Sequence, residues 1–250
     1  MKRIGPPRNS WGAQSDLVSL TRVEIPTRNV EFQAKPQNLQ IDLSSCALMI
    51  IDMQNDFCSP RGWLASIGVS VDEPNSIIES VGQVADALRN NDVPIIWLNW
   101  GNRPDRSNLP PGVVHVYNPD GNSVGIGDEL PGTNSKVLEK GSWSSAIVDL
   151  LKPASSDLFV DKYRMSGFFD TPLDSILRNL AVKTILFAGV NVDQCVLATL
   201  MDAASLGYDV ILLEDCCATT SPRYCVEATH YNVAQCFGFV ANSKHLIKSL

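Results

Sequence analysis

The stretch Ala47-Leu-Met-Ile-Ile51, followed at once by Asp52, decides the fold class of this chain. Five consecutive apolar residues without polar alternation are typical of a strand that is buried on both faces of a parallel sheet. An acidic residue directly after such a strand lies at the carboxyl edge of the sheet, where open α/β folds bind their ligands. The stretch therefore predicts a central parallel strand with a candidate functional carboxylate at its end.

Strand and helix signals alternate along the rest of the chain. Short apolar runs predict further strands at 94–98, 158–160, 184–188, 210–213 and 237–240. Helical spacing of apolar residues and N-terminal caps predict helices at 77–91, 144–151, 170–179, 193–207, 221–232 and from 243 onward. Alternation of this kind indicates crossover units, and hence a single α/β domain with helices on both faces of a mostly parallel sheet.

Two segments lack this alternation. Residues 1–40 are polar, aperiodic and dotted with Pro, which predicts an extended N-terminal arm before a domain that spans residues 41–250. The arm either wraps a neighbouring subunit or simply frays. Residues 101–133 are rich in Gly, Pro, Asn and Asp. Loops of this length inside a domain are usually functional, so this one is interpreted as a lid or a substrate-binding loop.

Composition narrows the class of partner. The net charge of −7 and the absence of a Lys/Arg cluster argue against nucleic acid and anionic membranes as partners. A hydrophobic content of 44% and a mean hydropathy of zero indicate a folded globular protein. No apolar leader or membrane span is visible, and the seven cysteines are interpreted as reduced thiols of a cytoplasmic protein. Three scattered histidines predict no metal site, and no cofactor is expected.

Three reactive side chains end predicted strands: Asp52, Lys162 and Cys195. A thiol attacks as the thiolate, and a helix N-terminus or a nearby cation lowers its pKa. The turn Gly189-Val-Asn-Val-Asp-Gln-Cys195 places the thiol in the first turn of a helix, where backbone N–H groups can also form an oxyanion hole. Asp52 is then the general base and acid, and Lys162 holds both groups in register. Taken singly, each residue has a plainer interpretation as a core thiol, a loop cap or a surface charge.

Local sequence around these residues resembles the isochorismatase-like cysteine hydrolases. The resemblance rests on Leu48-Met-Ile-Ile-Asp-Met-Gln-Asn-Asp-Phe57, Ala188-Gly-Val-Asn-Val-Asp-Gln-Cys-Val196 and Leu213-Glu-Asp-Cys-Cys-Ala218, and it covers roughly residues 44 to 245. It implies a three-layer, Rossmann-like fold with a six-stranded, mostly parallel sheet. It also implies an Asp52–Lys162–Cys195 catalytic triad and a cis peptide at Val190–Asn191, which turns the Asn191 and Cys195 amides toward one oxyanion.

Comparison within that family limits the substrate. Nicotinamidases carry an Asp-x-His-x-x-His metal site where this chain reads Asn99-Trp-Gly-Asn-Arg-Pro-Asp105, so a nicotinamidase is disfavoured. Isochorismatases proper lack the nucleophilic Cys. Residues 140–143 and 162–178 resemble ureidoacrylate hydrolases, whereas 101–105 and 125–128 resemble biuret and triuret hydrolases. Asn191 and Val192 replace the Ala-Thr that is common in the ureidoacrylate enzymes, so the exact substrate stays open.

Several residues are candidates for binding the substrate. Gln235 falls where the resemblance places a ureide-binding Gln, and a backbone-bonded polar residue is the equally weighted alternative. Arg103, with Arg106, either holds a substrate carboxylate or is a solvated charge. Asn55, beside Gln54, orients Asp52, binds substrate or bonds the loop. The aromatic candidates for the pocket wall, with core packing as their alternative, are Phe57, Trp100 and Phe168.

The sequence thus predicts a cysteine amidohydrolase that cleaves a C–N bond of a small linear ureide or amide through a thioester-type acyl-enzyme. One alternative keeps the triad and changes the substrate to a carboxamide or an N-carbamoyl amino acid, as in N-carbamoylsarcosine-type amidases. The other is a non-catalytic binding protein. By resemblance, the protein is expected to be a homodimer or homotetramer.

Overall fold

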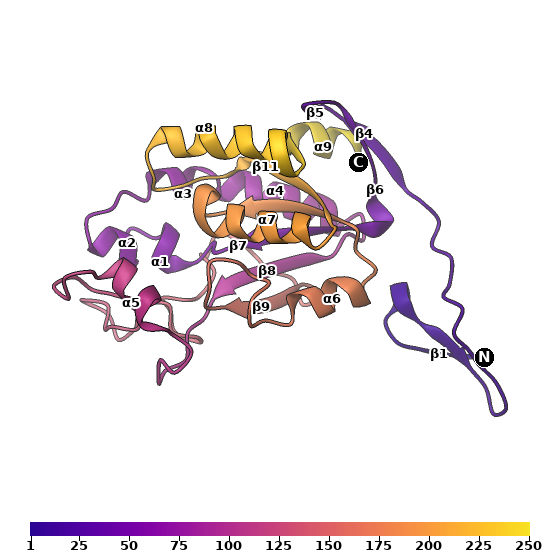
Figure 1. The fold of residues 1–250 in the computed structure, drawn as a ribbon, viewed down its shortest axis with the longest axis horizontal. Coiled ribbons are helices and arrows are strands. Elements are labelled where there is room, and N and C mark those ends of the chain that lie inside the picture. Colours follow the sequence, from indigo (N-terminus) through magenta and orange to yellow (C-terminus); the bar gives the residue numbers. More distant parts are fainter.

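A seven-stranded sheet forms the centre of the computed structural model, which describes all residues 1–250 (Figure 1). In spatial order its strands are β5 (Ala34–Lys35), β12 (Phe239–Ala241), β11 (Asp209–Cys217), β10 (Thr184–Gly189), β7 (Cys46–Ile51), β8 (Ile95–Trp100) and β9 (Leu158–Lys162). The last six are mutually parallel, and only β5 is antiparallel to its neighbour. The predicted parallel α/β sheet is therefore confirmed.

β7 and β10 lie at the centre of this sheet, and every residue of both strands is buried. Their register pairs Thr184 with Cys46 and Gly189 with Ile51, so both strands end at the same edge. Because alternate residues of a strand point to opposite faces, β7 supplies Leu48 and Ile50 to one core and Met49 and Ile51 to the other. This two-sided burial explains the uninterrupted apolar run.

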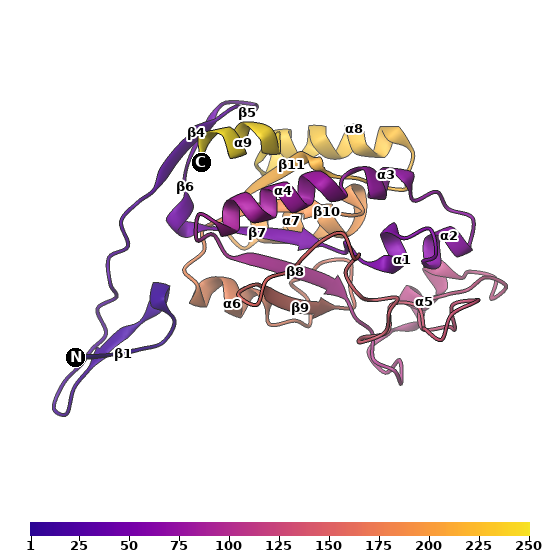
Figure 2. The same ribbon diagram turned by 180° about the vertical axis from the view of Figure 1, so that it is seen from behind.

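Helices cover both faces of the sheet, which gives the predicted three layers. One face carries α3 (Asp72–Ser76), α4 (Ile78–Arg89) and α9 (Ser243–Ser249). The other carries α6 (Leu173–Asn179), α7 (Leu197–Ser205) and α8 (Arg223–Asn232). The second set lies in front in Figure 1 and the first set in front in Figure 2.

The connections after β7 and β8 gather beyond the carboxyl ends of the strands (Figure 2). They contain α1 (Asn55–Cys58), α2 (Trp63–Ser66) and α5 (Pro111–Tyr117). The predicted helix at 144–151 is wrong, because this segment forms turns. Its backbone pairs with the β7–α1 connection instead: Asn55 N–H donates to Ala146 O, and Val148 N–H donates to Met53 O. Those bonds replace the hydrogen bonds of a helix.

Two further elements differ from the sequence-based expectation. The helix expected from residue 193 begins as a π-helix, η3 (Val192–Val196), which continues into α7. A second π-helix, η4 (Val233–Phe237), follows α8 and delays β12 until Phe239. Apolar periodicity gave no sign of either π-turn, because each spans only five residues.

The first 45 residues contain ordered pieces. Three strands, β1 (Lys2–Ile4), β2 (Trp11–Ala13) and β3 (Val18–Ser19), form a small antiparallel sheet around η1 (Pro7–Asn9). This sheet projects to one side of the molecule (Figure 1). A second ribbon, β4 (Asn29–Phe32) and β6 (Leu39–Asp42), leads through η2 (Leu43–Ser45) into β7.

The strand count differs from the one that the family resemblance implied. Six strands were expected, and the seventh is β5, which joins the edge of the sheet when Ala34 pairs with Ala241. Polar residues without periodicity gave no sign of this strand, because an edge strand of two residues needs no apolar pattern. None of the helices is long and apolar enough to cross a membrane.

Candidate active site

Asp52, Lys162 and Cys195 come together at the carboxyl edge of the sheet. The Lys162 Nζ lies 2.8 Å from Asp52 Oδ2 and 3.3 Å from Cys195 Sγ. β9 ends at Lys162, β7 ends one residue before Asp52, and η3 carries Cys195. Because neighbouring parallel strands end at one edge, residues far apart in the sequence become one cluster.

This cluster is almost fully buried. Asp52 and Lys162 are 0% exposed and Cys195 is 4% exposed. Apart from the ion pair with Lys162, neither carboxylate oxygen of Asp52 makes a hydrogen bond. A buried carboxylate with so few partners is costly for folding, and groups left in this state are typical of sites that exchange protons with a ligand.

The turn before Cys195 is held from two sides. Gly189 has a φ of 116°, and a Cβ there would collide with the carbonyl oxygen of Ile51. The next peptide, Val190–Asn191, is cis, as the family resemblance implied. On the other side, Val192 N–H donates to Ala218 O at 2.9 Å, and Thr220 N–H donates to Asn191 Oδ1 at 3.2 Å. The β11–α8 connection therefore fixes the position of the turn that carries Cys195.

Burial raises the pKa of the Cys195 thiol to about 12. The Lys162 ammonium opposes this effect, while the Asp52 carboxylate reinforces it. Burial thus outweighs the Lys162 ammonium in setting the pKa of this thiol. With the thiol protonated, attack on a substrate requires a base within reach of the sulfur.

Asp52 and Lys162 form a coupled buried pair. Burial raises the pKa of the Asp52 carboxyl, and the ammonium of Lys162 acts against that rise. The pKa of Lys162 is raised because Asp52 and Cys195 lie beside it and outweigh burial, which alone would lower it. The pair is therefore an ammonium facing a carboxylate whose proton affinity is higher than usual.

Met165 and Tyr117, which the sequence did not single out, cover the thiol, and Trp63 packs against Tyr117. Met165 Sδ lies 3.7 Å from Cys195 Sγ, and the hydroxyl of Tyr117 lies 3.7 Å from Met165 Sδ. The Tyr117 ring packs edge-on against Trp63, with 5.3 Å between ring centroids. The charges of Cys195 and Asp52 add to burial in raising the pKa of Tyr117, which places its hydroxyl within their field. The sequence predicts that the loop at residues 101–133 is a lid or binds substrate, but nothing in its composition indicates which of its residues reaches the site.

Two predicted substrate-binding residues lie at this edge. Trp100 is 1% exposed, and the Lys162 Nζ lies 4.5 Å from the centroid of its ring. Asn55 is buried and donates from Nδ2 to Trp143 O at 2.9 Å. Its neighbour Gln54 donates to the Trp100 carbonyl and accepts from the Trp100 N–H. The side-chain amides of Gln54 and Asn55 thus bond to the backbone of Trp100 and Trp143 at the walls of the site, and they do not orient Asp52.

Phe57 also lies near this edge, whereas the other candidates lie apart from the triad. Phe57 packs edge-on against Trp63 at 6.5 Å. The Arg103 guanidinium is bound to Asp105 in its own exposed loop. Phe168 stacks on Tyr208, just before the amino end of β11.

Gln235 is exposed in η4, which leads into β12. Gly238, next to η4, packs against Val210 near the start of β11. The strands are parallel, so this start lies at the edge opposite Cys195. The structure therefore does not bring Gln235 together with the triad of its own chain.

Cavities elsewhere on the surface have volumes of about 280 to 730 Å³, and none of them is lined by a residue of the triad. No group of three or more His, Cys, Asp or Glu side chains is arranged to hold a metal ion.

The three-layer α/β fold, with a buried cluster of Asp52, Lys162 and Cys195 at the carboxyl edge of its sheet, is typical of an enzyme that acts on a small molecule. Residues 46–245 match the model of the isochorismatase domain, and the chain belongs to this family. It is 33% identical to "Ureidoacrylate amidohydrolase RutB" of Azorhizobium caulinodans over 83% of this chain and 91% of that protein. Its identity to the protein of the same name from Klebsiella pneumoniae is 31%, over 88% and 93% respectively.

A solved structure is also similar. The cysteine hydrolase from Pseudomonas syringae pv. phaseolicola superposes with a TM-score of 0.71 at 26% identity, covering 84% of this chain and 93% of that one. The family prediction from the sequence motifs is thus confirmed, as is the prediction that the chain is a hydrolase.

Proposed function

We propose that the protein is a cysteine amidohydrolase that cleaves a C–N bond of a small linear ureide. The observation that carries this proposal is the position of the Lys162 ammonium, in contact with both the Asp52 carboxylate and the Cys195 sulfur. One cation that touches a base and a thiol in a dry site is suited to nucleophilic attack on a carbonyl. A carboxylate with a purely structural role is expected to accept several hydrogen bonds that offset its buried charge, and Asp52 has only the contact with Lys162.

In the first step, Asp52 takes the proton of the Cys195 thiol as the sulfur attacks the carbonyl carbon. The Asn191 N–H makes no hydrogen bond within the chain. Together with the Cys195 N–H it is proposed to hold the oxyanion. Collapse of the tetrahedral intermediate breaks the C–N bond, and Asp52 returns its proton to the leaving nitrogen.

In the second step, Asp52 takes a proton from water, and the hydroxide attacks the thioester carbon. Cys195 leaves as the thiol once it is protonated from Asp52. For a carboxamide the product is a carboxylate. For a ureide it is a carbamate, which decomposes to carbon dioxide and ammonia. Lys162 stays protonated throughout and stabilises whichever of its two partners is negative.

Substrate access requires a change in the covering side chains, because Cys195 is 4% exposed and its sulfur lies 3.7 Å from Met165 Sδ. Met is flexible and tolerates rearrangement, so Met165 and Tyr117 are proposed to form a movable cover above the thiol. Trp100 and Phe57 then form walls of the opened pocket.

Ureidoacrylate is the proposed substrate class because two relatives named for that activity match the chain at 31% and 33% identity over more than four fifths of its length. Biuret, triuret, N-carbamoyl amino acids and simple carboxamides also have a carbonyl carbon bonded to nitrogen, and they are the alternative substrates. Ammonia or carbamate release from a panel of ureidoacrylate, biuret, triuret, N-carbamoylsarcosine and nicotinamide tests the proposal. Fastest turnover of a ureide supports it. Turnover of nicotinamide alone, or of none of the five, contradicts the substrate class.

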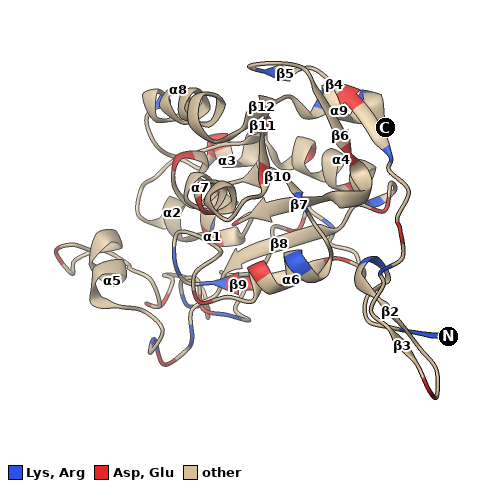
Figure 3. Cartoon of the chain, turned by 45° about the vertical axis from the view of Figure 1, so that its right-hand side comes forward, with Lys and Arg blue, Asp and Glu red and all other residues tan.

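The arm is proposed to pack on a second copy of the chain in a homodimer or homotetramer. Residues 1–28 hold five Lys or Arg and two Asp or Glu, whereas the rest of the chain holds 15 basic and 25 acidic residues. Lys and Arg mark the N-terminal end of the projecting arm in Figure 3. The arm also exposes Ile4, Trp11, Leu17, Val18 and Leu20. Apolar side chains on a basic strip suit the acidic surface of a neighbour. Removal of residues 1–28 should lower the number of subunits per particle, obtained from light scattering as the particle mass divided by the subunit mass; an unchanged number contradicts this role.

A further inference from the structure

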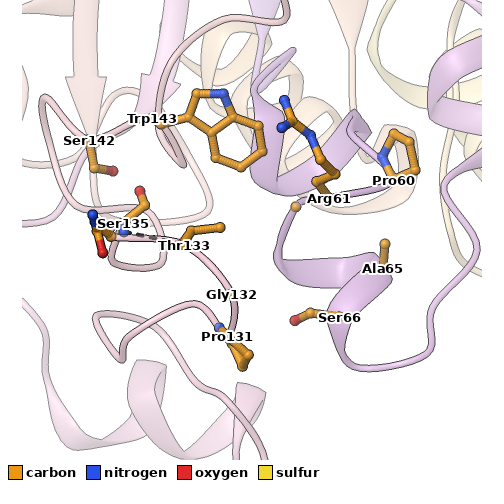
Figure 4. Close-up of a pocket in the computed structure, with 12 residues that line it drawn as sticks. Pro60, Arg61, Ala65, Ser66, Pro131, Gly132, Thr133, Ser135, Ser142 and Trp143 are labelled. Atoms are coloured by element: carbon orange, nitrogen blue, oxygen red, sulfur yellow. Dashed lines mark hydrogen bonds between the residues drawn. The ribbon is translucent and has the colours of Figure 1, made fainter.

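A cavity of about 730 Å³ lies between α2 and the loop at residues 131–143 (Figure 4), and no residue of the triad lines it. Its lining consists of Pro60, Arg61, Gly62, Ala65, Ser66, Pro131, Gly132, Thr133, Asn134, Ser135, Ser142 and Trp143. Cavities of this size hold ligands of drug-like dimensions. Nothing in the proposed hydrolysis uses these residues.

The charge of the lining is unusual for this acidic chain. Arg61 is its only charged residue, and no Asp or Glu contributes. The Arg61 guanidinium forms neither an ion pair nor a hydrogen bond; it lies 5.1 Å from the centre of the Trp143 ring. In Figure 4 the guanidinium points toward the indole across one side of the cavity. A guanidinium presents a planar fork of N–H donors that matches a carboxylate.

Most of the other polar groups are already engaged. The hydroxyls of Ser66, Thr133 and Ser142 donate to backbone carbonyls of their own segments. Ser135 Oγ accepts from the Ser144 N–H, Asn134 adds an amide, and the other side chains offer small apolar surfaces and the Trp143 ring. The free guanidinium of Arg61 beside the Trp143 ring is therefore the main feature for ligand recognition. It suits a ligand with a single negative charge on a flat organic group.

The walls of the cavity are preorganised. The Trp143 carbonyl accepts from Asn55 Nδ2, which fixes the residue that carries the indole. A Cβ on Gly62 would collide with the Asn55 carbonyl, so the α2 wall lies directly against the same residue. A site that is already shaped loses little free energy in becoming ordered when a ligand binds.

We propose that this cavity binds a small planar organic monocarboxylate, with the carboxylate on Arg61 and the planar part against Trp143. No residue of the triad lines this cavity, so we expect the ligand to be bound and not converted there. A phosphate would find only one cation and no second charge, which favours the carboxylate.

Isothermal titration of the full-length protein with benzoate tests the proposal. Benzyl alcohol, which has the same ring without the charge, is the ligand control. We expect saturable binding of one benzoate per chain and at least tenfold weaker binding of benzyl alcohol. We also expect Arg61→Gln to weaken benzoate binding at least tenfold. Arg61 is exposed, so its replacement leaves the fold intact; an unchanged thermal midpoint checks this.

Arg22→Gln is the matched protein control. Arg22 also stacks on a tryptophan, Trp11, at 5.3 Å, but on the arm and outside any described cavity. Its replacement should leave the affinity for benzoate unchanged. Cys195→Ala should likewise bind benzoate as the wild type does, which separates this site from the catalytic centre and from the proposed hydrolysis.

Three results would overturn the proposal. These are no saturable benzoate binding, equal benzoate affinity of the wild type and Arg61→Gln, and loss of benzoate binding in Cys195→Ala.

Discussion

The two halves of the catalytic edge are built in different ways. The half formed by β7, β9 and η3 is anchored in the central sheet, where β7 and its neighbour β10 are buried along their whole length and β9 pairs with β8 at the edge. The half formed by residues 101–157 contains one short helix and no strand of the central sheet. The first half places Asp52, Lys162 and Cys195, and the second places Tyr117 above them. We infer that the strand ends carry the chemistry and that the loop controls access.

The largest expected effect comes from the strand half. Asp52→Asn keeps the shape of the side chain but removes the base, so kcat should fall by about 10³-fold or more. Combining it with Cys195→Ala should add little further loss, because residues that act as a unit are not additive.

Asp161→Asn is the control for this change. Asp161 precedes Lys162 on β9 but pairs with Lys140 at the surface, so its replacement should leave kcat nearly unchanged. Equal losses in Asp161→Asn and Asp52→Asn, measured as initial rates on the same ureide, would contradict the role of Asp52.

The second effect concerns the point where the loop returns to the sheet. Asp157, immediately before β9, accepts from Arg89 Nε and Nη2 and from Trp97 Nε1. Asp157→Asn leaves Arg89 without its buried partner, and the free energy of unfolding should fall by about 3 kcal/mol. Urea denaturation measures this change.

Asp86→Asn provides the comparison, because Asp86 contacts the same guanidinium from the exposed side. It should cost less than about 1 kcal/mol. A larger loss in Asp86→Asn than in Asp157→Asn would show that burial does not determine the strength of this anchor.

The third effect is on the pH dependence of the chemistry. Burial raises the pKa of Asp52 above its ordinary value of 3.8. As the pH falls through the raised pKa, the carboxylate gains a proton and can no longer accept one from Cys195. The acid limb of kcat/KM should therefore lie above pH 3.8 and fall about tenfold per pH unit. A profile that stays flat down to pH 3.8 would contradict Asp52 as the base.

The smallest effect comes from the loop half. Tyr117→Ala removes a cover from the thiol but no reacting group, so kcat/KM should change by roughly fivefold, mainly through KM. Tyr231→Ala, an exposed residue on α8, is the matched control and should change neither constant. A loss from Tyr117→Ala comparable to that from Asp52→Asn would mean that the loop takes part in the chemistry.

The same division explains what could be predicted from the sequence. The apolar runs at Ala47–Ile51 and Thr184–Ala188 report burial directly, so the central strands and the residues that follow them could be placed from local pattern. Asp52, Lys162 and Cys195 were grouped because parallel strands share one edge. Their 2.8 and 3.3 Å contacts required the structure.

Long-range backbone pairing accounts for what the sequence did not show. Segment 144–151 has the composition of a helix, yet its backbone bonds to residues 53–56. Met165, just after β9, contacts Cys195, and Tyr117 of the long loop contacts Met165; no local pattern encodes either contact. Gln235 was matched to a family position, but its place in η4 sets it apart from the triad. The raised pKa of Cys195 reflects burial, which a sequence motif does not report.

The central claim is that Cys195 attacks the substrate with help from Asp52 and Lys162. The most direct measurement compares the initial rate of ureide hydrolysis by the wild type and by Cys195→Ser at equal enzyme concentration. We expect the serine variant to lose at least about 10³-fold in rate, because it keeps the fold and has a far weaker nucleophile. Wild-type turnover by Cys195→Ser would contradict the account.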